Sequence, residues 1–297
     1  MTLRAPALDA SVAHKSCGSK THRWQDRGVT RPIYVVDAFS EGPFRGNPAG
    51  VVPLEAGDIP SDEWMQTTAA EMKHSETAYI EPCADGTFGL RWFTPEVEVD
   101  LCGHATLASA HVLFEIGRLG PDAAAVFRTR GGDLRATREP DGAVQLDFPT
   151  APPQPCDAPD GLLEALGVSK AESLCTTGQF FMLVVPDASI VRELAPNFHA
   201  LGVLADVRGV YVTAPGDDGN HDIVSRCFAP RVGIDEDPVT GSMHCVLSAY
   251  WCDRLGKTEI NAEQASARGG TMRVKLAGDR TRLVGRAVTV LRGELLA

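Results

Sequence analysis

The sequence predicts an α+β protein made of two similar domains that face each other. The main observation is a repeat of the pattern Arg-x-Phe-x-Pro, which occurs at 91–95 and again at 226–230. Each copy is followed by an acidic stretch, then a glycine, then an apolar helix. The proline-rich stretch FPTAPPQPCDAPD at 148–160 separates the two halves and is the best linker candidate. A length of 297 residues suits two domains of about 150 residues, each with a core of its own.

The first half alternates short β-rich runs with two helices. Strands are predicted within RPIYVVDAFS (31–40), VVPL (51–54), SETAYIEP (75–82) and TFGLRWFTP (87–95), with a loop at EGPFRGNPAG (41–50). Ser61 is a suitable N-cap for a helix over 61–74, because its hydroxyl can accept a hydrogen bond from a first-turn N–H group. Apolar residues at helical spacing predict a second, buried helix over 105–116 that ends before Gly117.

The second half repeats this rhythm. It predicts a short helix at 161–166 and strands at FFMLVVP (180–186), GVYVTAP (209–215) and HDIVSRCFAP (221–230). A helix over 243–255 ends before Gly256, and strands at MRVKLAG (272–278) and AVTVLRGEL (287–295) complete the chain.

Composition excludes several classes of protein. The formal net charge of −11 argues against a nucleic-acid partner, which would require a basic face. No run of about 18 apolar residues is present, so we expect no transmembrane helix and no membrane partner. The eight cysteines lack C-x-x-C spacing, which argues against a zinc framework and indicates a reducing compartment. We therefore expect a cytoplasmic protein.

Residues 1–31 differ from the rest of the chain. They hold six Lys and Arg residues against Asp9 and Asp26, and they show no apolar periodicity. They also lack the apolar segment of a secretory signal, and they resemble a transit peptide only loosely. We expect an N-terminal extension without regular structure.

The stretch GIDEDPVTGSMH at 233–244 raises a question of function, because a cluster of carboxylates precedes a helix start. A helix start leaves backbone N–H groups without partners and carries partial positive charge. A glycine there lets an anion approach the backbone closely. Two such starts, Gly103-His104 and Gly241-Ser242, could hold a carboxylate substrate between the domains. A plainer interpretation is that Asp235, Glu236 and Asp237 only cap the helix and solvate the loop.

Several blocks together resemble the PhzF family of phenazine-biosynthesis proteins, within the diaminopimelate epimerase-like superfamily. They are VDAFSEGPFRGNPAGVV, HSETAYI, RWFTPEVEVDLCGHATLASA, TTGQFFMLVVP, GIDEDPVTGSMHCVLSAYW and GRAVTVLRGEL. The resemblance implies two pseudo-symmetric domains, each an antiparallel sheet rolled around a central helix. It also implies domain limits of 32–150 and 151–285, with 286–297 as a final strand that returns to the first domain.

The resemblance also implies an active site between the domains. Glu76 of His-Ser-Glu-Thr corresponds to the family's catalytic glutamate, and a carboxyl in an apolar pocket has a raised pKa suited to taking and giving protons. His104, Asp237 and Ser242 correspond to groups that orient substrate and relay protons. Substrate-binding positions complete the set: Gly46, Asn47, Gly103, Thr240 and Gly241.

Two departures from related patterns bear on the chemistry. The superfamily's epimerases and proline racemases use two thiols, one at each helix start. Cys102 matches the first, but the second position reads as Val239, with Thr240 beside it. A two-thiol racemase is therefore not expected. The family's Gln-Gly-x-x-x-Gly-Arg segment is also altered, because Gln264 is followed by Ala265.

The leading hypothesis is an isomerase in which Glu76 moves a proton and a double bond within a small cyclic or amino carboxylic acid. The family's type reaction uses trans-2,3-dihydro-3-hydroxyanthranilate, and the resemblance implies secondary metabolism, no metal, no organic cofactor and a homodimer. One alternative is an epimerase or racemase that uses Cys102 and Glu76 as unlike bases. The other is a non-catalytic protein that binds small molecules.

Overall fold

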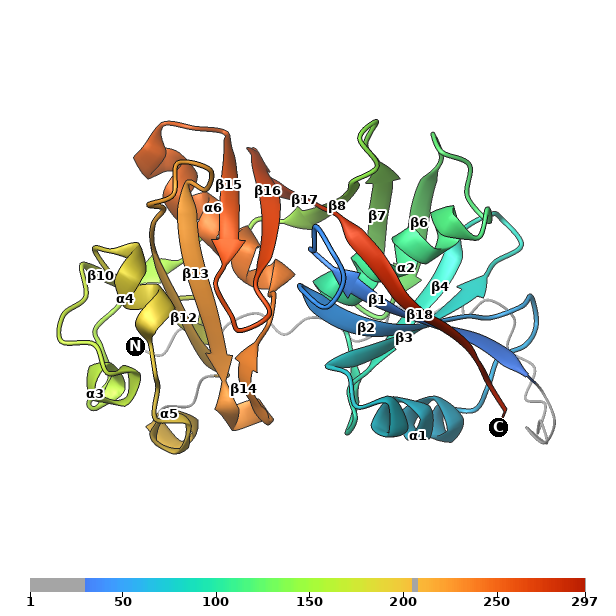
Figure 1. Ribbon diagram of the computed structural model, residues 1–297, viewed down its shortest axis with the longest axis horizontal. Helices are drawn as coiled ribbons and strands as arrows, with labels where there is room; N and C mark the ends of the chain where they lie inside the picture. Colours follow the sequence, from blue (N-terminus) through green and yellow to red (C-terminus); the bar gives the residue numbers. More distant parts are fainter. Residues whose placement is uncertain (1–29, 205–207, 297) are drawn as a thin grey trace, which may run out of the picture.

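The computed structural model describes residues 30–204 and 208–296, which form two lobes side by side (Figure 1). The N-terminal lobe contains β1 Arg31–Ala38, β2 Asn47–Pro53, α1 Asp62–Met72, β3 Glu76–Pro82, β4 Phe88–Phe93, β5 Glu98–Val99, α2 Gly103–Glu115, β6 Ala124–Thr129, β7 Gly132–Arg138 and β8 Val144–Pro149. The C-terminal lobe contains β9 Gln154–Pro155, α3 Leu162–Leu166, β10 Ser173–Thr176, β11 Phe180–Val184, α4 Ala188–Glu193, α5 Phe198–Leu204, β12 Gly209–Pro215, β13 Ile223–Ala229, η1 Pro230–Val232, β14 Ile234–Asp237, α6 Gly241–Leu255, β15 Glu259–Gln264, β16 Gly270–Ala277 and β17 Arg280–Gly285. The last strand is β18 Ala287–Leu295.

The two lobes have the same strand pairings, in agreement with the predicted pseudo-symmetry. In the N-terminal lobe β1 pairs antiparallel with β2, β2 parallel with β3, β3 antiparallel with β4, and β4 parallel with β6. The C-terminal lobe repeats this series with β10, β11, β12, β13 and β15. The sheets are thus mixed rather than purely antiparallel, because the helical crossovers through α1 and α2 join strands that run in the same direction.

The chain passes between the lobes twice. After β8, the short strand β9 pairs with β10 in the C-terminal lobe. After β17, the long strand β18 returns to pair antiparallel with β1 in the N-terminal lobe. β8 also pairs with β17, so the two sheets are joined directly where they meet.

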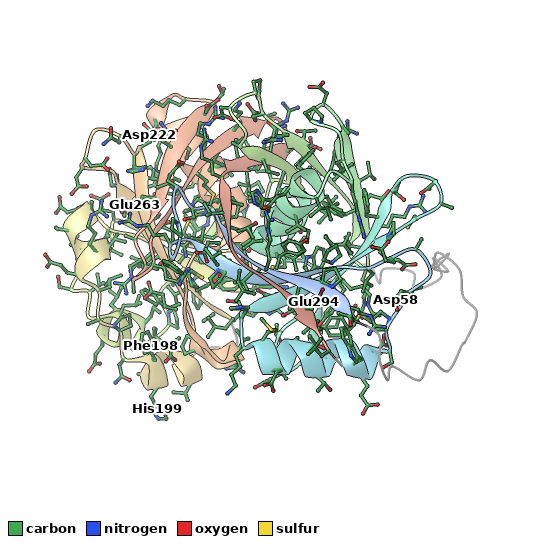
Figure 2. The ribbon with its side chains drawn as sticks, turned by 45° about the vertical axis from the view of Figure 1, so that its right-hand side comes forward. Asp58, Phe198, His199, Asp222, Glu263 and Glu294 are labelled. Atoms are coloured by element: carbon green, nitrogen blue, oxygen red, sulfur yellow. The ribbon has the colours of Figure 1, made fainter. Side chains whose placement is uncertain are left out.

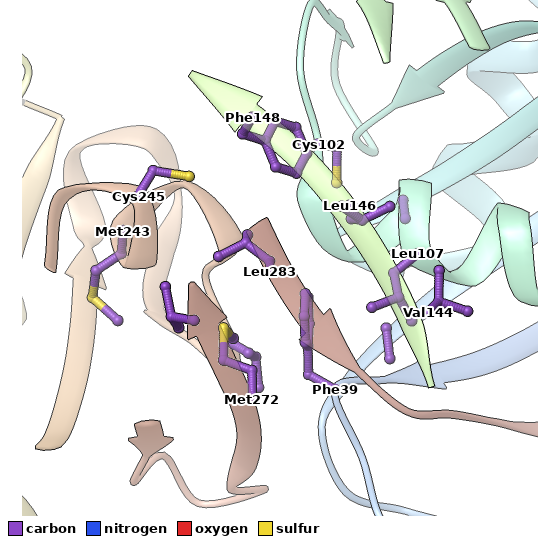
Figure 3. Packing of buried hydrophobic residues seen from close by; sticks show 14 of the residues in the cluster. Phe39, Cys102, Leu107, Val144, Leu146, Phe148, Met243, Cys245, Met272 and Leu283 are labelled. Atoms are coloured by element: carbon purple, nitrogen blue, oxygen red, sulfur yellow. The ribbon is translucent and has the colours of Figure 1, made fainter. Parts of the chain in front are cut away.

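One hydrophobic cluster crosses the boundary between the lobes, and each lobe also has a separate cluster of its own. A single buried cluster runs from Leu107 of α2 across Leu146 of β8 and Leu283 of β17 to Met243 of α6 (Figure 3). These four side chains are at most 1% exposed. Because the sheet joint and the core both cross the boundary, the relative position of α2 and α6 is fixed by packing.

The predicted helices are present, but the two central ones begin earlier than expected. Ser61 is the N-cap of α1, and its hydroxyl accepts from the Trp64 N–H group at 3.1 Å. α2 and α6 each begin two residues before the predicted start, so Gly103 and Gly241 lie inside the first turns. The glycines lack apolar side chains, so periodicity alone does not mark them as helical.

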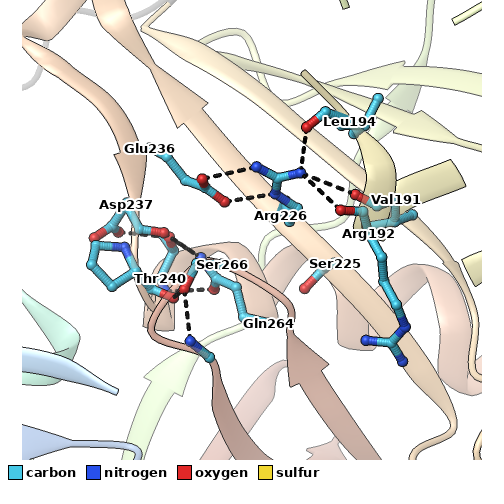
Figure 4. Close-up of polar contacts among 12 residues, drawn as sticks. Val191, Arg192, Leu194, Ser225, Arg226, Glu236, Asp237, Thr240, Gln264 and Ser266 are labelled. Carbon is cyan, nitrogen blue, oxygen red and sulfur yellow. Dashed lines mark hydrogen bonds and ion pairs between the residues drawn. The ribbon is translucent and has the colours of Figure 1, made fainter. Parts of the chain in front are cut away.

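The repeated Arg-x-Phe pattern has the same structural role in both lobes. Arg91 forms an ion pair with Glu98 at 2.7 Å, and Arg226 pairs with Glu236 at 2.7 Å (Figure 4). Each guanidinium also lies about 5 Å from the ring of the phenylalanine two residues later. The ion pair therefore ties β4 to β5, and β13 to β14, just before each central helix.

The predicted N-terminal extension falls almost wholly outside the described residues. Its last residue is a correction: Arg31 begins β1, and its buried guanidinium pairs with Asp58, labelled in Figure 2, at 2.7 Å. In the described part of the chain, no helix combines the length and apolar character needed to cross a membrane.

Candidate active site

The N-terminal ends of α2 and α6 meet at the boundary between the lobes. A Cβ atom placed on Gly103 would lie 3.3 Å from the Cα atom of Gly241. Any larger side chain at either position would push the two helix starts apart. The first turn of neither helix holds an acidic residue, and neither N-cap makes a side-chain hydrogen bond to its helix. Free N–H groups and two positive helix ends therefore converge at one place.

A cavity of about 250 Å³ opens beside these helix starts, and both lobes line it. Its lining residues are Ser75, Glu76, Leu101, Cys102, Gly103, His104, Phe148, Pro149, Ala151, Ile234, Asp237, Val239, Thr240, Gly241, Ser242 and Cys245. The described lining contains no Lys or Arg, so an anion would depend on helix N–H groups and hydroxyls for its binding. The size suits one small molecule.

Glu76 is the first residue of β3, and its side chain is only 14% exposed. Its Oε2 atom is buried and lies 3.3 Å from Nε2 of His104. This contact does not have hydrogen-bond geometry, and Oε2 has no hydrogen-bond partner among the described residues. The pKa of Glu76 is raised to about 8, mainly by burial and also by the charge of Asp237, while a hydrogen bond with the Cys102 thiol acts in the opposite direction. Glu76 can therefore exchange a proton near neutral pH.

His104, in the first turn of α2, is buried and uncharged. Burial lowers its pKa to about 3, and the nearby His74 adds to this effect. Nδ1 faces two donor groups, the Asn47 amide at 3.3 Å and the Cys102 thiol at 3.4 Å, and this arrangement favours a ring proton on Nε2, toward Glu76. The contact between His104 and Glu76 is therefore one between two groups that are mostly neutral at pH 7, and not an ion pair.

Asp237 ends β14 and faces the same cavity from the other lobe. Its two carboxylate oxygens accept from the Asn47 amide at 2.8 Å and from the Thr240 hydroxyl at 2.6 Å. Burial raises the pKa of Asp237 to about 6, although these two hydrogen bonds hold it lower than burial alone would. At pH 7 Asp237 is thus mainly ionised while Glu76 is mainly protonated.

Asn47 connects the two lobes from behind these groups. It is fully buried, and its amide nitrogen also donates to the Val239 carbonyl at 2.9 Å. Gly46 has a φ of 64°, and a Cβ there would lie 2.2 Å from the Ala38 carbonyl oxygen, so the turn requires glycine. Neither residue is part of the cavity lining, so the structure places both behind the site.

The predicted residues at the start of α6 separate into two roles. Ser242 is exposed to the cavity in the first turn, whereas Thr240 is the N-cap. The sequence comparison of Val239 with a second thiol position is wrong. The residue equivalent to Cys102, which is the N-cap of α2, is Thr240, and Val239 is a fully buried core residue.

Gln264 is the main residue that sequence reasoning did not assign to the site. Its side-chain oxygen accepts from the Thr240 N–H group at 2.7 Å, and its nitrogen donates to the Asp237 carbonyl at 2.7 Å (Figure 4). Gln264 is fully buried. It therefore holds the turn that carries Asp237. Its match to the family pattern was the available signal, but the pattern alone gave it no role.

The donor atoms of Glu76, Cys102 and His104 lie within 4.8 Å of one another, so the structure brings together a group that sequence spacing did not reveal. A metal would require the thiolate and the carboxylate forms. Burial raises the pKa of the Cys102 thiol well above its usual range, with Glu76 adding to the effect.

Comparison with known proteins identifies first the class and then the family. A hydroxyproline epimerase from Agrobacterium vitis, 12% identical, superimposes with a TM-score of 0.58 over 90% of this chain and 92% of that one. This likeness and the paired lobes define a diaminopimelate epimerase-like fold of the predicted class.

The family is defined by closer relatives. The model of the PhzC-PhzF family, described as phenazine biosynthesis-like protein, matches residues 36–293. An uncharacterized isomerase of Halalkalibacterium halodurans is 46% identical over 272 residues, covering 90% of this chain and 99% of the relative. A PhzF-family protein of Enterococcus faecalis is 39% identical with a TM-score of 0.84, covering 90% of this chain and 99% of that one. The chain belongs to the PhzF family and is isomerase-like.

Proposed function

We propose that this protein is an isomerase that moves a proton and a double bond within a small carboxylic acid, with Glu76 as general acid and base. The observation that carries the proposal is the Glu76 side chain. Its Oε2 atom is buried and unpartnered at the cavity, and its pKa is about 8. A group with a pKa near the working pH is both a competent base and a competent acid.

In the proposed reaction, the Glu76 carboxylate removes a proton from a carbon next to a double bond. The electron pair released forms a new double bond to the neighbouring carbon, and the original double bond opens. Protonated Glu76 then returns the proton to the far carbon, so substrate and product have the same atoms. The neutral Nε2–H of His104 can hold the Glu76 carboxylate in place by a hydrogen bond when the carboxyl ionises.

The remaining groups would bind and orient the substrate. The helix starts at Gly103 and Gly241, with Ser242, would receive a carboxylate. The ionised Asp237 would receive a donor group of the substrate. Thr240 fixes Asp237, and Asn47 and Gly46 support both from behind.

The epimerase alternative requires Cys102 as a second base. The raised pKa of this buried thiol disfavours that role, because the thiolate is the reactive form. The equivalent position in the other lobe, Thr240, cannot act as a thiol base. A protein that only binds small molecules has no need for a carboxyl that exchanges protons near neutral pH, so the raised pKa of Glu76 favours an enzyme over a binding protein.

We also propose a cytoplasmic role in the metabolism of small carboxylic acids, of the kind that the family description associates with phenazine-like biosynthesis. The seven cysteines within the described residues are all free thiols, which suits a reducing compartment.

The test is a kinetic comparison of the wild type, Glu76→Gln and Glu81→Gln with dihydrohydroxyanthranilate and a panel of small cyclic unsaturated acids. Glu81 lies on the same strand but outside the cavity lining, so Glu81→Gln is the matched control. We expect Glu76→Gln to lower kcat/KM roughly 10³-fold and the control to retain activity. Wild-type activity should also rise with pH through about 8, because the base form of Glu76 becomes populated there. Full activity of Glu76→Gln would contradict the proposal.

A further inference from the structure

A second cavity lies in the N-terminal lobe, near the end of α2 that is remote from the candidate active site. α2 packs against β7, β8 and β18 (Figure 1), and its last turns contribute His111, Phe114 and Glu115 to a cavity of about 440 Å³. An α-helix rises 1.5 Å per residue, so His104 and Phe114 are about 15 Å apart along its axis. The two cavities share no lining residue. This cavity is therefore a separate place in the molecule.

Two guanidinium groups meet in this cavity beside Gly142, in the turn between β7 and β8. A Cβ atom placed on Gly142 would lie 3.8 Å from Nη2 of Arg138 and 3.9 Å from Nη1 of Arg286. No other described side chain lies within 4 Å of that point. Two cations that share one cavity repel each other unless a negative group lies between them. A negative group at this point would contact both.

The acidic side chains of the lining already pair with other arginines. These pairs are Glu115 with Arg292, and Asp141 and Glu41 with Arg286. Arg138 has no ion pair among the described residues, and its guanidinium lies 5.8 Å from the Phe114 ring. The pKa of His111 is lowered to about 4, mainly by burial and also by the charges of Arg138 and Arg292. The charge of Arg138 therefore acts inside the cavity without an acid to balance it.

The rest of the lining includes apolar surface that an inorganic ion would not use. Phe114 comes from α2, Val144 from the start of β8, and Ala287 and Val288 from the start of β18. Val144 is only 2% exposed, so it is a fixed part of the wall. A ligand that covers this surface and also carries a negative group gains from both parts of the lining.

We propose that this cavity binds a small organic anion, with a carboxylate or phosphate group between Arg138 and Arg286 and an apolar body against Phe114 and Val144. Guanidinium groups match the oxygens of both anions and can donate paired hydrogen bonds to them. The site contains none of the residues of the proposed isomerase chemistry, so the two proposals stand independently. One charged group and a small apolar body predict a Kd on the order of 1 mM.

The two histidines of α2 provide one reporter for each cavity, because His111 lines this cavity and His104 lines the candidate active site. The full chain is labelled with isotope-enriched histidine, and its imidazole NMR signals are assigned with single His→Gln variants. Benzoate, phenyl phosphate and inorganic phosphate are titrated to about 50 mM. We expect benzoate and phenyl phosphate to shift the His111 signal saturably, and inorganic phosphate to bind about tenfold more weakly than phenyl phosphate.

Arg138→Gln should weaken the binding seen at His111 at least tenfold. Arg135→Gln is the matched control, because Arg135 is exposed on the same strand and lies outside the lining, and it should leave the Kd unchanged. Circular dichroism establishes that both variants are folded. Equal binding in Arg138→Gln and the wild type would overturn the proposal. So would inorganic phosphate that binds as tightly as phenyl phosphate.

A second pair of variants fills the site without removing an arginine. Gly142 has a φ of 88°, and Asp and Asn tolerate positive φ best after glycine. Gly142→Asp places a carboxylate beside both guanidinium groups and should abolish binding, whereas the uncharged Gly142→Asn should weaken it much less. Equal effects of Asp and Asn would contradict the proposal. A response confined to His104, with no saturable shift of His111, would also overturn it and leave the proposed function untouched.

Discussion

The two helix entrances have the same architecture and different chemistry. In the N-terminal lobe, Cys102 caps α2 and the carboxyl beside it, Glu76, has a buried oxygen without a partner. In the C-terminal lobe, Thr240 caps α6 and the carboxyl beside it, Asp237, has hydrogen bonds to both oxygens. Burial acts on both, yet the pKa is about 8 for Glu76 and about 6 for Asp237. In the proposed mechanism this difference makes Glu76 the proton carrier and Asp237 the fixed anion, although both lie in the same repeated framework.

Apart from its effect on activity, Glu76→Gln is expected to cause the largest change in the free energy of unfolding. Glu76→Gln removes a carboxyl whose pKa in the folded protein, about 8, lies above its ordinary value of 4.5. The protonated form favours folding below pH 4.5, and that contribution is lost as pH rises through 8. Glu76→Gln should therefore raise the free energy of unfolding by on the order of 3 kcal/mol at pH 8, and by much less at pH 4. Urea unfolding at both pH values measures this, and an equal effect at both would contradict the assigned burial of the charge.

Asp237→Asn tests the other entrance. The substitution keeps an acceptor for Asn47 but removes the fixed anion. We expect kcat/KM to fall roughly 10- to 100-fold, and any rise in activity that follows ionisation of Asp237 near pH 6 should disappear. The rise that follows ionisation of Glu76 should remain but move to a pH below 8, because the Asp237 charge helps to raise the Glu76 pKa. A pH–rate profile on any accepted substrate is the measurement. If the rise that follows ionisation of Glu76 disappeared instead, the two carboxyls would have exchanged roles.

Gln264→Leu tests whether the Gln264 amide holds the Asp237 carboxylate in position. Without the amide, the Thr240 N–H group and the Asp237 carbonyl lose their buried partners. The expected cost is about 2 kcal/mol in the free energy of unfolding, together with a smaller loss of activity than in Asp237→Asn. Gln145→Leu, which loses only a 3.4 Å contact to Thr137, is the control. Equal stability loss in both variants would remove the special role of Gln264.

The smallest effect on activity is expected from substitution of the Cys102 thiol. Cys102→Ala should change kcat/KM by no more than about threefold, since a thiol with a raised pKa contributes no base at neutral pH. Steady-state kinetics give the answer, and loss of activity comparable to Glu76→Gln would favour the epimerase alternative.

The sequence predicted the repeat, and it predicted the starts of the two central helices to within two residues, because both leave local signals: the Arg-x-Phe pattern, the glycines and the apolar periodicity. It could not predict distances across the lobes. Asn47 meets Asp237 only because strands far apart in sequence pair and pack. The error at Val239 has a local cause, since one residue of helix register decides whether Val239 or Thr240 is the N-cap. The pKa values of the two carboxyls likewise depend on burial, which spacing does not encode.

The most direct test is the fate of solvent deuterium. An accepted substrate is converted in heavy water by the wild type, Glu76→Gln and Cys102→Ala, and products are read by mass spectrometry and NMR. We expect deuterium at the carbon that receives the proton from Glu76 after the double bond has shifted, with no inverted stereocentre. This labelling should be lost in Glu76→Gln and retained in Cys102→Ala. Deuterium at an inverted stereocentre with no moved double bond, lost in Cys102→Ala, would contradict it.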